Sequence, residues 1–135
     1  MASGYSGTPL VKKLGIKDEF TVATIGEPPE FRGLLDGLPA GVEFTRLDGP
    51  TDIVMLFVTE RAVLGANMPS AADAIFPGGA IWVAWPKKAS KVITDVTEDT
   101  VRDVVLPMGL VDNKVCAINE VWSGLRVVWR KELRT

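Results

Sequence analysis

The heptapeptide Asp52-Ile-Val-Met-Leu-Phe-Val58 is the most informative stretch for the fold class, because six consecutive apolar residues follow its aspartate. A strand with one face in water alternates apolar and polar residues, whereas a strand without such alternation is covered on both faces. The stretch therefore predicts a central parallel strand, with helices packed on both sides of its sheet.

Strands and helices alternate outward from this run. We expect strands at residues 20–25, 42–47, 52–58, 80–85, 111–119 and 125–130. Helical segments are expected at 8–15, 28–37, 59–76 with an interruption at Pro69, and from Thr97 to Pro107. This order predicts an α/β fold with an open, mostly parallel, doubly wound sheet. The short turn VWSG predicts a C-terminal antiparallel hairpin, and right-handed crossovers then give the strand order 2-1-3-4-6-5.

Two helix starts carry capping signals. Thr8 is an expected N-cap, followed by Pro9 at the first helical position, and Gly15 is placed to end that helix. Thr97 is the expected N-cap of the later helix, which should pack on the sheet through Val101, Val104 and Val105.

Composition narrows the class of protein. The length of 135 residues predicts one domain over 1–135, and the order of elements divides it into a helical arm (1–18) and a core (19–135). The residues are 47% hydrophobic and carry a net charge of −2. No nucleic acid or membrane partner is expected, because the chain has no basic excess and no apolar run of about 20 residues. The N-terminus lacks a signal-peptide pattern, so we expect a cytoplasmic protein.

The chain has no histidine and a single cysteine, Cys116. Ser-His-Asp and Cys-His catalysis, a disulfide framework and the usual Cys/His zinc sites are therefore excluded. We expect no metal and no cofactor, and an enzyme would depend on Lys, Arg, Asp, Glu, Ser, Thr or Tyr.

The element order, with FPGGAIWV at residues 76–83, resembles a shortened class I methyltransferase-like Rossmann core. The segments YSGTPLVKKLGIK (5–17), WPKKAS (85–90) and WSGLRVVWR (122–130) resemble a family of small bacterial proteins that carry a domain of unknown function. The first resemblance implies a Gly-rich cofactor turn after the first strand. Here that turn reads Ile25-Gly-Glu-Pro-Pro29, with a single glycine and two prolines that donate no hydrogen bond. Asp48 stands where the family keeps an acidic residue for ribose hydroxyls.

Candidate ligand contacts follow from where strands end. In an open α/β sheet, ligands bind beyond the carboxyl ends of the strands, so residues after the third and fourth strands should lie around one crevice. We expect these to be Thr59, Arg61, Trp85, Lys87, Lys88 and Ser90. Their charges suit a carboxylate or phosphate, although a doubled lysine is equally typical of a solvated turn. Ser6 and Thr8, before the first helix, form a secondary candidate anion site, for which a plain N-cap is the simpler reading.

Three functions stay open on these residues. The favoured one is a non-catalytic binding or regulatory module for a small anion, on a methyltransferase-like core that has lost its cofactor turn. The second is a transferase with an atypical S-adenosylmethionine or phosphate-ester site. The third is a structural protein or homo-oligomer that uses Trp122, Trp129 and the hairpin edge.

Overall fold

The computed structural model describes residues 8–135. Its centre is a sheet of six strands: β1 (Thr21–Ile25), β2 (Glu43–Thr45), β3 (Ile53–Phe57), β4 (Ala80–Pro86), β5 (Leu110–Ala117) and β6 (Trp122–Trp129). The spatial order is β2-β1-β3-β4-β6-β5. The first four strands are parallel, and β6 runs antiparallel to both β4 and β5. The predicted fold class and strand order are confirmed.

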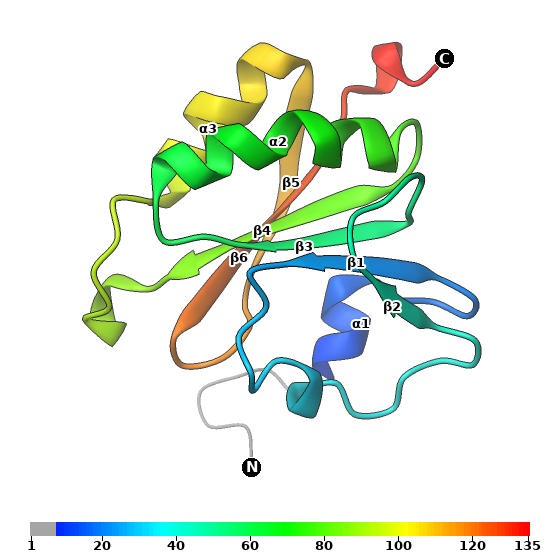
Figure 1. The fold of residues 1–135 in the computed structure, drawn as a ribbon, viewed down its shortest axis with the longest axis horizontal. Helices are drawn as coiled ribbons and strands as arrows, with labels where there is room; N and C mark the ends of the chain where they lie inside the picture. Colours follow the sequence, from blue (N-terminus) through cyan, green and yellow to red (C-terminus); the bar gives the residue numbers. More distant parts are fainter. Residues whose placement is uncertain (1–7) are drawn as a thin grey trace.

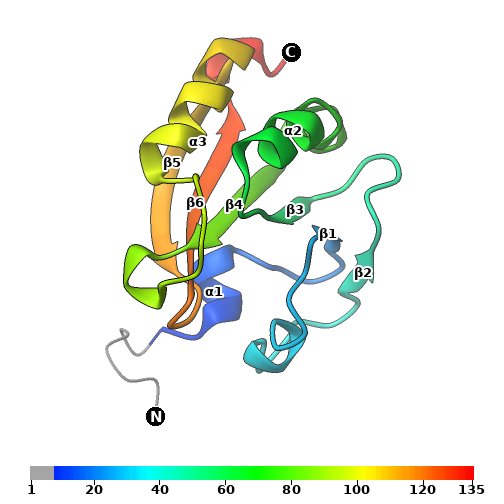
Figure 2. The same ribbon diagram turned by 60° about the vertical axis from the view of Figure 1, so that its left-hand side comes forward.

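The two faces of the sheet are covered unequally. Helices α2 (Arg61–Ile75) and α3 (Glu98–Val105) lie on one side, and the five-residue helix α1 (Leu10–Leu14) lies on the other (Figure 1, Figure 2). Short 3₁₀ turns complete the structure: η1 (Arg32–Leu34), η2 (Lys88–Ser90), η3 (Leu106–Met108) and η4 (Lys131–Leu133). None of the helices in residues 8–135 combines the length and the apolar composition needed to cross a membrane.

The central strand is covered on both faces, as its sequence predicts. Every residue of β3 is buried. Val54 and Leu56 join the apolar cluster under α2 and α3, while Met55 and Phe57 join the cluster on the α1 side. The uninterrupted apolar run therefore marks the middle of the sheet.

Helix α1 is held to the sheet by a buried hydrogen bond. The indole Nε1 of Trp82, on β4, donates to the Leu14 carbonyl oxygen at 3.0 Å. This carbonyl belongs to the last turn of α1, where no helical N–H is available to it. Gly15 ends the helix in the left-handed conformation with φ of 77°, as predicted.

The predicted start of α3 is confirmed. Thr97 is its N-cap, and its side chain forms a reciprocal capping box with Thr100. Val101 and Val105 are buried, and Val104 is partly buried against the same core. The predicted Thr8 cap of α1 is wrong, because Pro9 occupies the N-cap position and no side chain caps the helix.

Three other boundaries differ from the sequence prediction. Pro69 does not interrupt α2, because it lies on the exposed side one turn after Gly65, whose carbonyl group can bond to water. The segment 28–37 forms only the turn η1, which ends at Leu35, where the backbone leaves the helical region (φ −99°, ψ 72°). The hairpin turn precedes Trp122, where the Asn119 side chain accepts from the backbone N–H groups of Val121 and Trp122.

Candidate functional site

The predicted residues after β3 are tied to a neighbouring loop. The Thr59 carbonyl oxygen accepts from the Thr94 hydroxyl at 2.6 Å and from the Asp95 N–H at 3.3 Å. Asp95 Oδ1 in turn accepts from the Arg61 N–H at 2.7 Å. Asp95 therefore places a carboxylate at the N-terminus of α2, where an anionic ligand would otherwise find a free donor.

The predicted residues after β4 lie on the same edge of the sheet, since β3 and β4 are neighbours. The Ser90 hydroxyl donates to the Lys87 carbonyl oxygen at 2.6 Å and accepts from the Val92 N–H at 3.2 Å, which stabilises the turn η2. Lys88 is exposed, and Trp85 is buried in the core under α2 and α3. A common anion held by Lys87, Lys88 and Arg61 stays a prediction.

The secondary candidates contribute less. Asp48 is exposed and lies three residues beyond the last residue of β2. Thr8 is exposed and caps nothing, and Ser6 lies outside the described residues. Within residues 8–135, no group of three or more Asp, Glu or Cys side chains lies close enough together to hold a metal ion.

Aromatic rings pack beside the carboxyl ends of the parallel strands. Phe57, the last residue of β3, makes edge-on contacts with Phe31 and Trp122, with ring centroids 5.1 and 5.2 Å apart. Phe31 is completely buried, and Phe57 is only 4% exposed. Side chains therefore fill the α1 side of this end of the sheet.

The turn after β1 serves packing within the protein. Gly26 has φ of 69°, and a Cβ atom there would lie 2.5 Å from the carbonyl oxygen of Phe57. The glycine thus allows two strands to approach each other. Glu27 is paired with Arg32 at 2.7 Å, and the Arg32 guanidinium stacks 4.2 Å from the ring centre of Phe44.

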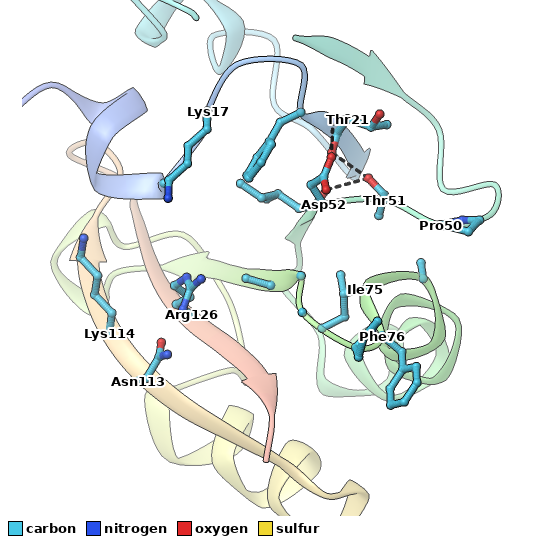
Figure 3. A pocket seen from close by; sticks show the side chains of 18 of the residues that line it. Lys17, Thr21, Pro50, Thr51, Asp52, Ile75, Phe76, Asn113, Lys114 and Arg126 are labelled. Carbon is cyan, nitrogen blue, oxygen red and sulfur yellow. Dashed lines mark hydrogen bonds between the residues drawn. The ribbon is translucent and has the colours of Figure 1, made fainter. Parts of the chain in front are cut away.

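A pocket of about 700 Å³ lies at the opposite, amino-terminal edge of the parallel strands. It opens beside the first residues of β1, β3 and β4, on the side that the short helix α1 leaves partly uncovered (Figure 3). Five of the residues that line it are basic and one, Asp52, is acidic. This basic pocket, which includes Lys12, Lys13 and Lys17, was not predicted from the sequence.

Arg126 contributes to the basic pocket from a strand of the sheet. It lies on β6 in register with the completely buried Trp82, and it is half-buried itself. Burial lowers the pKa of the Arg126 guanidinium, and the positive charge of Arg134 lowers it further. Within residues 8–135 this guanidinium makes no hydrogen bond or ion pair. One signal was available in the sequence: a single charge inside the apolar stretch Leu125-Arg-Val-Val128.

Hydrogen bonds fix the walls of the basic pocket. Lys114 Nζ, on β5, donates to the Lys13 carbonyl oxygen at 2.9 Å and so links the edge strand to α1. On the other side, Asp52 Oδ2 accepts from the Thr21 N–H at 2.8 Å, and the Thr51 hydroxyl donates to the Thr21 carbonyl oxygen at 2.8 Å (Figure 3). Hydrogen bonds therefore connect the chain segments on each side of the basic pocket.

Comparison with known proteins defines the class of fold. A methyltransferase from Aquifex aeolicus that depends on S-adenosylmethionine superposes with a TM-score of 0.58 at 12% identity, covering 87% of this chain and 86% of that one. The ribosomal protein L11 methylase of Lactobacillus delbrueckii subsp. bulgaricus gives 0.55 at 10% identity, covering 90% and 75%. An O-methyltransferase from neocarzinostatin biosynthesis gives 0.62 at 10% identity and covers 83% of this chain, which spans only 49% of its length.

The chain thus has a class I methyltransferase-like Rossmann core. No protein-family model matches it, and no curated protein does, so membership of the small bacterial family stays a prediction. The residues do not fit the cofactor that the fold implies. Pro28 and Pro29 stand where backbone donors would be needed, Glu27 is already paired, and buried rings occupy the space beside the strand ends.

Proposed function

We propose that this chain is a non-catalytic module that binds a small anionic ligand and does not use S-adenosylmethionine. The observation that carries the proposal is the packing of Phe31, Phe57 and Trp122 beside the carboxyl ends of the strands. In this class of fold, a ligand at that end needs an open crevice and free N–H groups.

The energetics support the same conclusion. Micromolar affinity requires about 8 kcal/mol of binding free energy. Asp48 offers a single hydrogen bond, which contributes about 1 kcal/mol net. Arg32 already pairs with Glu27, so its guanidinium is not free to bind the carboxylate of the cofactor. These terms leave the chain far from the affinity of a methyltransferase.

Calorimetric titration with S-adenosylmethionine and S-adenosylhomocysteine tests the proposal. We expect no saturable heat for either compound below about 1 mM. A parallel titration of a methyltransferase with known affinity controls for the quality of the ligands. A saturable micromolar isotherm for either compound would overturn the proposal.

A transferase with an atypical site is the second candidate, and the likeness of the fold to methyltransferases favours it. Such an enzyme must displace Phe31 from its buried position to admit a cofactor beside β3. Saturable binding accompanied by a shift of the Phe31 ring resonances would support this candidate.

A further inference from the structure

We propose that the basic pocket binds an organic anion whose phosphate or carboxylate group contacts Arg126, Lys114 and Lys17, with its apolar part against Phe76 and Pro50. The proposal rests on the proposed function only in taking the ligand to be an anion. It moves the site away from the strand ends that ordinarily bind ligands in this class of fold.

A bulge in β5 places two positive charges opposite each other. The register passes from the pair Asp112–Val127 directly to the pair Lys114–Arg126, which leaves Asn113 unpaired. Without this bulge, Asn113 would lie opposite Arg126. Like charges on directly opposed residues destabilise a sheet, and bulges are frequent beside functional sites because they redirect a side chain. An anion between Lys114 and Arg126 would remove the repulsion.

The surroundings of Arg126 point to the same ligand. A half-buried guanidinium loses hydration and, within the described chain, gains no carboxylate in return. Such a group destabilises the fold unless something else supplies the acceptors. A planar guanidinium pairs with phosphate or carboxylate through two parallel hydrogen bonds.

The positive charge around Arg126 contrasts with the negative net charge of the whole chain. The whole protein carries a net charge of −2, yet this one concavity gathers five basic residues. Figure 3 shows Lys17, Lys114 and Arg126 around the same opening, from the segment after α1, from β5 and from β6. A cleft lined mostly by one sign of charge, as here with Asp52 as the single acidic residue among those that line it, focuses the field and attracts ligands of the opposite sign.

The opposite wall of the basic pocket is apolar. Pro50, Ile75, Phe76 and Pro77 line it, and Phe76 is 43% exposed. A volume of about 700 Å³ falls within the range of small-molecule sites. An anion with an attached ring or chain therefore suits the pocket better than a bare inorganic ion.

The doubled lysine after β4 is the competing site. There, Ser90 is engaged in its own turn, and Asp95 already occupies the N-terminus of α2. Both features weaken anion binding at that edge. The two sites can be separated by mutation, since they lie at opposite ends of the parallel strands.

The test is a titration of the protein with phenyl phosphate, benzoate and inorganic phosphate at low ionic strength, followed by thermal shift and amide NMR. Benzyl alcohol serves as the neutral control. We expect phenyl phosphate or benzoate to bind more tightly than inorganic phosphate, with amide shifts at Thr21, Asp52 and Arg126. The ratio of the affinities for phenyl phosphate and benzoate shows whether the pocket prefers phosphate or carboxylate.

Variants then locate the site. Arg126→Gln should weaken binding of the preferred probe at least about tenfold, equivalent to about 1.4 kcal/mol, without lowering the melting temperature of the free protein. Lys17→Gln, at an exposed position, should weaken it about threefold and keeps the test valid if Arg126→Gln folds poorly. Arg130→Gln, on an exposed residue just past β6, should bind as the wild type does.

Three results would overturn the proposal. The first is an unchanged affinity in both Arg126→Gln and Lys17→Gln. The second is the absence of saturable binding of any anionic probe by the wild type up to about 10 mM. The third is loss of binding in the double variant Lys87→Gln, Lys88→Gln but not in Arg126→Gln or Lys17→Gln. This result would leave the proposed function intact and would place the anion site at the carboxyl ends of the strands. Binding of S-adenosylmethionine is a separate outcome that contradicts the proposed function and not the basic pocket.

Discussion

Replacing Trp82 by phenylalanine should loosen the attachment of α1, which carries part of the basic pocket. Trp82 is completely buried, and its indole N–H is the partner of the Leu14 carbonyl oxygen. The variant leaves this acceptor buried without a donor, which costs about 1–3 kcal/mol. The smaller ring also leaves a cavity of about 40 Å³, worth roughly 1 kcal/mol. We therefore expect the free energy of unfolding to fall by about 2–4 kcal/mol.

Trp129 provides a matched control. Its indole N–H donates to the Ala72 carbonyl oxygen at 2.9 Å, near the end of α2, but this bond is only partly buried. Water can replace the lost donor there, so Trp129→Phe should cost about 1 kcal/mol. Urea unfolding followed by circular dichroism measures both variants without depending on tryptophan fluorescence. Equal losses in the two variants, or a loss below about 1 kcal/mol for Trp82→Phe, would show that the Leu14 carbonyl oxygen does not depend on the indole donor.

Two further predictions concern the hairpin. A Cβ atom at Gly124 would lie 3.1 Å from Trp82 Cε3 and 3.2 Å from Ile118 Cδ1, so Gly124→Ala should destabilise the fold by about 1–3 kcal/mol. Gly33 is the control, because a Cβ atom there would meet no atom within 4 Å. In the same urea assay, Gly33→Ala should change the free energy of unfolding by less than about 0.5 kcal/mol. Burial raises the pKa of the Cys116 thiol above its ordinary value of 9.0. As the pH rises above 9.0, the thiol ionises in the unfolded chain before it does so in the folded protein, so its contribution to stability is lost. The urea concentration at the unfolding midpoint should therefore fall less at alkaline pH in Cys116→Ala than in the wild type. Equal falls in both proteins would contradict this.

The sheet could be predicted from the sequence because its signals are local. The apolar run at residues 52–58 identifies the central strand, and Thr97 marks a helix start through its own side chain. The order of the strands then follows from the handedness of crossovers. Helix boundaries that depend on solvent exposure were harder to predict, as the continuation of α2 through Pro69 demonstrates.

The basic pocket could not be predicted in the same way. It depends on which residues meet across β5 and β6, and one bulge at Asn113 decides that Lys114 faces Arg126. A bulge has no distinctive sequence pattern here. Similarly, Gly124 suggested a turn, whereas in the structure it makes room for Trp82 within β6. Tertiary contacts gave these residues their roles.

We propose that this methyltransferase-like core has no functional cofactor site at the carboxyl ends of its strands. Amide NMR of the ¹⁵N-labelled protein during addition of S-adenosylhomocysteine tests it most directly, because Gly26, Glu27 and Thr59 report on that edge individually. We expect these three resonances to stay in place up to about 1 mM ligand. Saturable shifts of Gly26 and Glu27 at micromolar concentration would contradict it.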